Sequence, residues 1–200
     1  MLEKIQESMR SLKLEGAEKA ALFRELCFVN YRRIRIFAPV LLLAFLALAA
    51  VDLLNRSKGL WGSPGYFELF CVHALTAAAL LVMVIGLYPG QPRSAEDVAP
   101  RHRLAVVLFA YLMVLSAVAT TLVDQLIHGQ ISAYLIVAFG IGAALLMRNA
   151  GSSIMYSVSL ALFVAGMSFV QKDPKQLYGH YLNGSMMTVI AWLMSRVVYA

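Results

Sequence analysis

The chain has 200 residues, of which 60% are hydrophobic and only 14% are charged, and its formal net charge is +6. Soluble domains carry roughly a quarter of their residues as charged side chains, and a soluble chain of this length could not bury so much apolar surface. The composition therefore excludes an ordinary soluble domain and indicates an integral membrane protein. We expect no nucleic-acid partner, because the basic residues follow the loops between apolar blocks.

Residues 1–33 precede the first apolar block and alternate glutamate with lysine and arginine. An apolar stripe within this segment favours a cytoplasmic amphipathic helix that lies near the bilayer surface and leads into the first span. A partly disordered tail that only assists insertion is the alternative. The segment contains no cleavable apolar core, so we expect the first span to act as the membrane anchor.

Residues 34–200 are expected to form one transmembrane domain. They contain six apolar blocks, each close to the ~20 residues that a hydrocarbon core of about 30 Å requires. In lipid each span must satisfy its own backbone hydrogen bonds, so each block is expected to be helical. The predicted fold is thus all-α, a six-helix transmembrane bundle. The blocks are Ile34–Asn55, Tyr66–Tyr88, Arg103–Val123, Ile131–Met147, Ser153–Val170 and Leu177–Tyr199.

Local features refine these expectations. Pro39 is tolerable in the first span if it lies near the start of a helix. The short connection Arg148–Ser152 predicts that the fourth and fifth spans are an antiparallel pair. Small residues such as Gly140 are expected at helix-packing contacts. Cys27 and Cys71 are expected on opposite sides of the bilayer centre, so we do not expect a disulfide.

The orientation follows from the positions of the seventeen lysine and arginine residues. With a cytoplasmic N-terminus, the outer segments hold four of them, and the inner segments hold the other thirteen. We therefore expect both termini in the cytoplasm. The outer four are Arg56, Lys58, Lys172 and Lys175, and the inner thirteen are Lys4, Arg10, Lys13, Lys19, Arg24, Arg32, Arg33, Arg35, Arg93, Arg101, Arg103, Arg148 and Arg196.

Polar residues inside spans are costly, so their positions are informative. In this orientation most of them lie toward the outer face, and the inner half holds few. Asp124 and His128 are four residues apart, and His180 and Asn183 are three apart, so each pair shares a helix face. We predict one ligand-binding cavity in the outer half, with Asp52 at its rim and lined by His73, Asp124, His128, Tyr134 and Asn183. The alternative is that these groups cap helix ends or join helices.

Metal and catalytic signatures are missing from the sequence. Cys71, His73, Asp124, His128 and His180 are possible ligand types, but no pair has a dedicated zinc spacing, and we expect no metal and no other cofactor. Phosphate-binding loops, nucleophile elbows and kinase or cyclase signatures are also absent. We expect no catalytic residues and no enzyme activity in this chain.

Three stretches resemble a known family. They are Tyr31–Phe37 with the Val51-Asp52 end of the first span, Asp124–Leu135, and Tyr181–Gly184 continuing through Ile190–Arg196 to Tyr199. Together with His73, they resemble the six-helix N-terminal sensor regions (MASE-like) of bacterial diguanylate cyclases that have a GGDEF output domain. Related six-helix inputs occur on histidine kinases. The resemblance covers nearly all of residues 31–199.

The resemblance implies a multi-pass sensor of the bacterial inner membrane that binds a small or lipid-like ligand and regulates a cytoplasmic output domain. It also implies a homodimer, in which the N-terminal helix and the sixth span make the contacts and Gly184 allows close approach. The chain stops at Ala200, just past the sixth span, so cyclase activity cannot be assigned to it. The alternative is a free-standing small membrane protein, either a transporter or an assembly factor.

Overall fold

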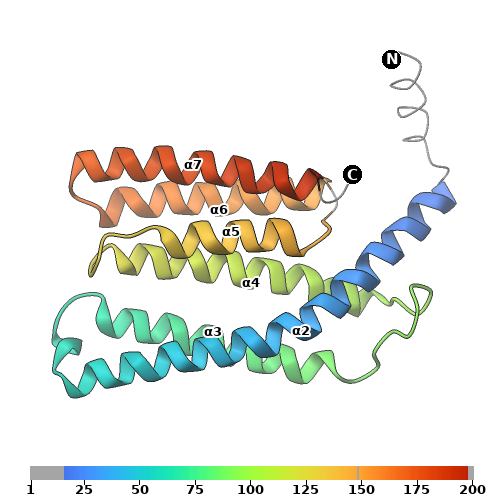
Figure 1. Cartoon of the computed structure of the whole chain (residues 1–200), viewed down its shortest axis with the longest axis horizontal. Coiled ribbons are helices and arrows are strands. Elements are labelled where there is room, and N and C mark those ends of the chain that lie inside the picture. Colours follow the sequence, from blue (N-terminus) through green and yellow to red (C-terminus); the bar gives the residue numbers. More distant parts are fainter. Residues whose placement is uncertain (1–15, 148, 198–200) are drawn as a thin grey trace, which may run out of the picture.

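The computed structural model describes residues 16–147 and 149–197, and every regular element in these ranges is helical (Figure 1). This confirms the predicted all-α class. The elements are α2 (Gly16–Ser57), the short 3-10 helix η1 (Leu60–Gly62), α3 (Tyr66–Leu87), α4 (Pro100–Asp124), α5 (Ser132–Ala144), α6 (Asn149–Val170) and α7 (Pro174–Val197).

Four of the described helices contain segments long and apolar enough to cross a membrane, namely Ala20–Ser57, Tyr66–Leu87, Pro100–Asp124 and Ala150–Val170. The length and composition of these four helices are typical of a membrane protein. Helix α5 is apolar but has only 13 residues, a length of about 20 Å at 1.5 Å per residue. Helix α7 has 24 residues but carries more polar groups. Full spans at α5 and α7 remain predictions.

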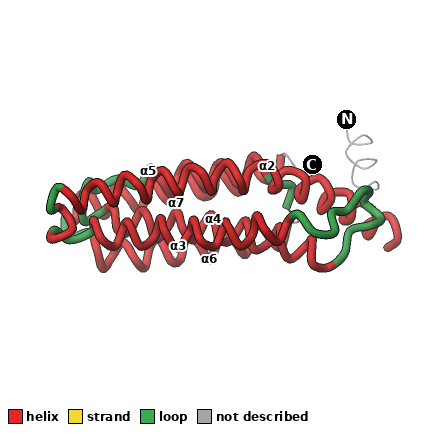
Figure 2. The backbone as a smooth tube through the Cα atoms, turned by 90° about the horizontal axis from the view of Figure 1, so that it is seen from below, coloured by secondary structure: helices red, strands yellow, loops and turns green. Residues whose placement is uncertain are grey.

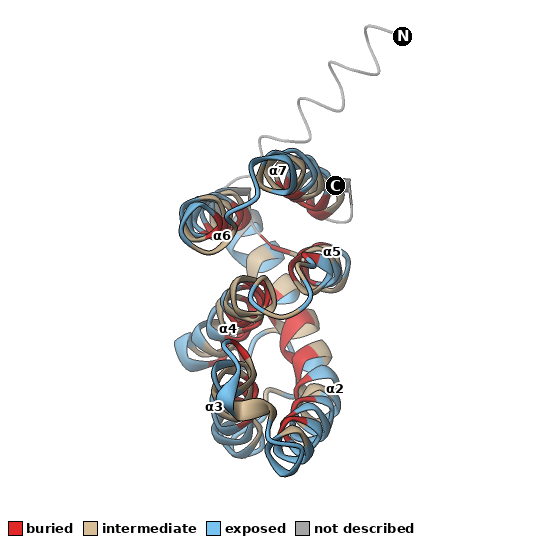
Figure 3. Cartoon of the chain, turned by 90° about the vertical axis from the view of Figure 1, so that its left-hand side faces the viewer, coloured by how far each residue is buried: buried red, intermediate tan, exposed pale blue. Residues whose placement is uncertain are grey.

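The helices form two layers, with α3, α4 and α6 in one and α2, α5 and α7 in the other (Figures 2 and 3). Consecutive helices run in opposite directions, so the chain is a row of three helical hairpins. Helix α4 lies at the centre and contacts α2, α3, α5 and α6. Its buried face, which includes Phe109, Met113 and Val114, supplies much of the core.

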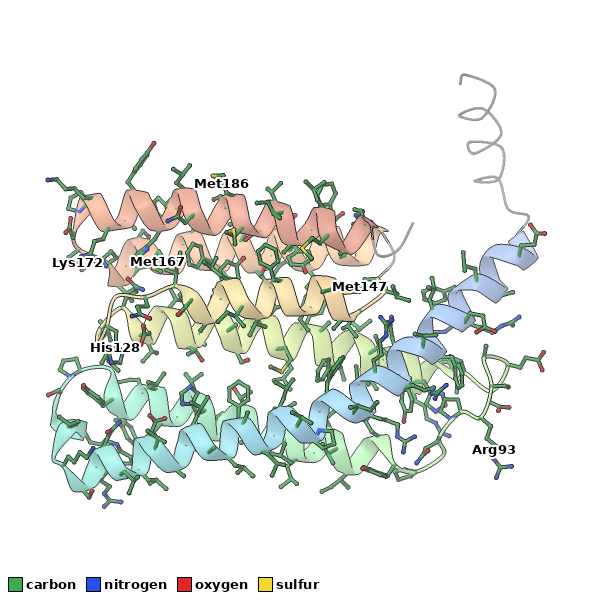
Figure 4. The ribbon with its side chains drawn as sticks, in the orientation of Figure 1. Arg93, His128, Met147, Met167, Lys172 and Met186 are labelled. Carbon is green, nitrogen blue, oxygen red and sulfur yellow. The ribbon has the colours of Figure 1, made fainter. Side chains whose placement is uncertain are left out.

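All connections lie at the two ends of the bundle. Residues 58–65, 125–131 and 171–173 are at one end, which we call the His128 end, and residues 88–99 and 145–147 are at the other, which we call the Arg93 end (Figure 4). The three predicted outer loops thus share one end of the bundle.

Helix α2 is a single helix of 42 residues, about 63 Å long. It runs without interruption through the expected boundary between residues 33 and 34, and its N-terminal part extends beyond the bundle at the Arg93 end (Figure 1). Pro39 lies in its interior rather than near a helix start, so that expectation was wrong. Proline has no amide hydrogen, so the helix lacks the usual hydrogen bond to the carbonyl of Arg35.

Glycines allow close packing at specific points of the bundle. A Cβ atom on Gly142 would lie 2.6 Å from the carbonyl oxygen of Ala191, and one on Gly184 would lie 2.4 Å from Cε1 of Phe163. Gly140 is exposed, and a Cβ atom there would contact nothing within 4 Å. The expectation of a packing role at Gly140 within the chain was therefore wrong, and Gly142 has that role instead.

Candidate functional site

Asp52 and His73 form a buried pair between α2 and α3. Asp52 Oδ2 lies 2.7 Å from His73 Nδ1, and each residue is only 4% exposed. Because an ionised carboxylate can only accept hydrogen bonds, Nδ1 carries the hydrogen when Asp52 is charged. Nε2 of a neutral His73 is then a free acceptor, and no hydrogen bond to it is present in the described part of the chain.

Aromatic side chains surround this pair at the His128 end. The ring of Phe45 packs edge-on against His73, with ring centroids 5.8 Å apart. The indole Nε1 of Trp61 donates to the backbone oxygen of Asp52 over 3.0 Å, and this contact holds the α2–α3 connection against the end of α2. A carboxylate and an imidazole are thus held in an apolar, aromatic setting, which strengthens their electrostatic interaction.

Asp124 and His128 form a second pair, 2.7 Å apart, at the end of α4. The side chain of His128 is 56% exposed, and the other Asp124 oxygen accepts the backbone amide of Gln130 over 3.2 Å. These contacts are all local to one turn. The i,i+4 spacing therefore correctly indicated a shared face, and the pair organises the α4–α5 loop (Figure 4).

Tyr134 belongs to a third group, which is centred on helix α5. It is fully buried and stacks on Phe163 with ring centroids 4.7 Å apart. Its hydroxyl lies 2.9 Å from Thr188 Oγ1 and 3.3 Å from Ser159 Oγ. Tyr134 thus joins α5 to α6 and α7 through hydrogen bonds, the interhelical role that buried hydroxyl groups commonly have in membrane proteins.

The six predicted site residues do not share one set of contacts. Asn183 is exposed on α7, and Asp52 with His73, Asp124 with His128, and Tyr134 belong to three different helix contacts. His180 is half-buried, and its Nε2 is buried without a hydrogen-bond partner. The structure therefore brings together only Asp52 and His73 as a buried interhelical pair with an open hydrogen-bonding position.

Sequence reasoning missed a polar cluster at the Arg93 end, where few such groups were expected. The amide of Asn30 donates to the carbonyl of Leu146 and accepts the amide hydrogen of the same residue, both over 2.8 Å. Arg33 donates to the carbonyl of Ala144 over 2.8 Å, and the Tyr31 hydroxyl donates to the carbonyl of Leu87 over 2.7 Å. We call Asn30, Tyr31 and Arg33 the α2 clasp, because one segment of α2 holds the C-terminal ends of α3 and α5.

His102 and Asp97 organise the adjacent α3–α4 loop. The buried His102 accepts the backbone amide of Ala99 at Nδ1 over 2.9 Å, so Nε2 carries the hydrogen and donates to the carbonyl of Gly90 over 3.0 Å. The backbone amides of Arg93 and Ser94 donate to Asp97 and hold the pKa of its carboxyl below the usual range. The loop is thus ordered by hydrogen bonds of its own side chains.

No three of the His, Cys, Asp or Glu side chains in residues 16–147 and 149–197 are grouped so as to hold a metal ion. Cys27 is buried, Cys71 is half-buried, and both are free thiols. No family model, no curated protein and no solved structure matches the chain.

Proposed function

We propose that the chain is a transmembrane sensory module that binds a small or lipid-like ligand beside the Asp52–His73 pair and regulates a cytoplasmic output domain, of the diguanylate cyclase kind. The main support for this proposal is the buried hydrogen bond between Asp52 on α2 and His73 on α3. Buried ionisable groups in membrane helices are costly and usually functional, and His73 Nε2 offers a hydrogen-bonding position to a ligand.

The continuity of α2 supports a signalling role. The same helix carries Asp52 near the His128 end and the α2 clasp near the Arg93 end, and continues beyond the bundle. A ligand that separated Asp52 from His73 would change the packing of α2 on α3. Because a helix transmits displacement along its length, that change would reach the segment of α2 that leaves the bundle.

The proposal includes the orientation and the oligomeric state. The Arg93 end would face the cytoplasm of a bacterium, and both ends of the chain would lie there. A homodimer would form through α2 and α7. Gly184 cannot provide the close approach in that dimer, because it is buried and Phe163 occupies the space beside it, so the expectation for Gly184 was wrong.

The test joins the chain through its C-terminus to a diguanylate cyclase domain and measures cyclic di-GMP formation as small polar and lipid-like compounds are added. We expect a compound that changes the activity, and we expect the Asp52→Asn variant to lose that response while it accumulates normally in the membrane. Asparagine can still hydrogen-bond to His73, whereas removing one partner completely leaves a buried group unpaired, which costs about 3–5 kcal/mol in a buried pair.

Asp124→Asn is the matched control, because it makes the same change at the exposed pair of the α4–α5 loop. A response lost equally in both variants, or no response to any compound, contradicts the proposed site. Transport of a solute by the purified chain in liposomes, without any effect on a joined cyclase, would favour the transporter alternative.

A further inference from the structure

A cavity of about 270 Å³ lies at the Arg93 end, between α2, α4 and the start of α6. Its wall is mostly apolar and includes Phe23, Leu26, Val106 and Met147, the last of which is labelled in Figure 4. The volume is near the lower end of the roughly 300–1,000 Å³ typical of small-molecule pockets. The cavity can therefore hold a small head group and the start of a hydrocarbon chain.

Arg103 is the charged residue among the described residues of this wall, and its buried Nε has no acceptor among them. Its Nε is buried without a hydrogen-bond partner, and no ion pair or hydrogen bond to Arg103 is present among the residues that the structure describes. The guanidinium lies over the ring of Phe23, 4.8 Å from the centroid. Buried polar groups are normally hydrogen-bonded, so an orphaned arginine at a cavity indicates a missing anionic partner.

Among the described polar groups of the wall, Arg103 is the one suited to bind an anion. The side-chain amide of Asn30 is already bonded at both ends to the backbone of Leu146, and none of the described residues of the wall is an aspartate or a glutamate. Ala150 and Gly151 belong to the first turn of α6, a helix of 22 residues, and line the same cavity. The free amides and the dipole at a helix N-terminus favour an anion at this position.

We infer that this cavity binds an anionic phospholipid from the surrounding leaflet, with its phosphate on Arg103 and the upper part of an acyl chain along the apolar wall. Other basic residues at this end of the chain, such as Arg101 at the start of α4, favour anionic over neutral lipid. A free anion would not use the apolar wall, and in a zwitterionic lipid the attached cation offsets the charge of the phosphate. The inference depends on the membrane character of the chain and not on its proposed sensory role.

The experiment titrates the purified full chain in detergent with phosphatidylglycerol and with phosphatidylcholine, and counts bound lipids by native mass spectrometry. We expect one phosphatidylglycerol to bind more tightly than phosphatidylcholine, and Arg103→Gln to weaken that binding by roughly tenfold. Arg93→Gln is the matched control, because it removes the same charge from an exposed side chain of the α3–α4 loop that points away from the helices (Figure 4). It should leave the affinity unchanged.

A second variant, Gly151→Leu, tests the cavity without changing a charge. A Cβ atom on Gly151 would contact nothing within 4 Å, and leucine favours helix over glycine, so this variant should fold and should exclude the lipid. Binding that survives Gly151→Leu, or that falls equally in the Arg93 and Arg103 variants, overturns the inference. Competition by inorganic phosphate that releases the phosphatidylglycerol would identify a free-anion site and would also overturn it.

Discussion

At the scale of single residues, Asn30 makes the most specific contact in the α2 clasp. Its side chain satisfies both the amide and the carbonyl of Leu146, in the segment between α5 and α6. Asn30→Ala should lower the free energy of unfolding by about 1–3 kcal/mol, because it leaves part-buried backbone groups unpaired. The same variant should speed hydrogen exchange at the Leu146 amide. Asn55→Ala, on the same helix but without such a contact, is the control. Unchanged exchange at Leu146 would contradict the role of the clasp.

The clasp also shows the limit of residue-level prediction from the sequence. The Asp124–His128 pair was predictable because both groups are local and four residues apart. The partners of Asn30, Tyr31 and Arg33 are backbone carbonyls from helix ends more than fifty residues away, and no side-chain pattern marks a carbonyl. The prediction that Asn183 lines the cavity was wrong for another reason. Spacing indicates which residues share a helix face, but it does not indicate which direction that face takes in the bundle.

At the scale of helices, two glycines of α5 provide a matched test of packing. Gly142→Ala would place a Cβ atom 2.6 Å from the backbone oxygen of Ala191, which cannot rotate away. We expect the change to separate α5 from α7 and to lower stability by about 1–3 kcal/mol. In Gly140→Ala the new Cβ atom would contact nothing within 4 Å, so this change should be neutral or should raise stability by up to about 1 kcal/mol. Unfolding of both variants in detergent measures the difference, and equal stabilities would contradict the packing role of Gly142.

The helix boundaries were predictable only where hydropathy changes with the backbone conformation. The block Tyr66–Tyr88 matches α3 to within one residue. The block Ile131–Met147 overestimates α5, which ends at Ala144 although the next residues are still apolar. The side chains of Asn30 and Arg33 bind the backbone there, so a tertiary contact rather than composition ends the helix. The sequence did not predict that α2 is one continuous helix, because the polarity of the segment changes near residue 33 while its helical conformation does not.

At the scale of the whole molecule, the two ends of the bundle differ in charge. The loops at the His128 end carry Lys58 and Lys172, whereas the Arg93 end carries Arg93, Arg101 and the arginines of the α2 clasp region. Consecutive helices alternate in direction, so the connections form two sets, one at each end of the bundle. We propose that the Arg93 end faces the cytoplasm, because lysine and arginine prefer that side of the membrane.

The orientation can be measured with reporter fusions at four positions. Fusions at Gly62 and Lys172, in the connections of the His128 end, should report the outer side, and fusions at Arg93 and Asn149 should report the cytoplasm. These positions also test α5, because a short α5 that failed to cross would place Asn149 on the outer side. An external Arg93 would reverse the assignment of both ends. The proposed lipid cavity would then lie in the outer leaflet. The Asp52–His73 pair would lie nearer the cytoplasm, where it could not bind an external ligand.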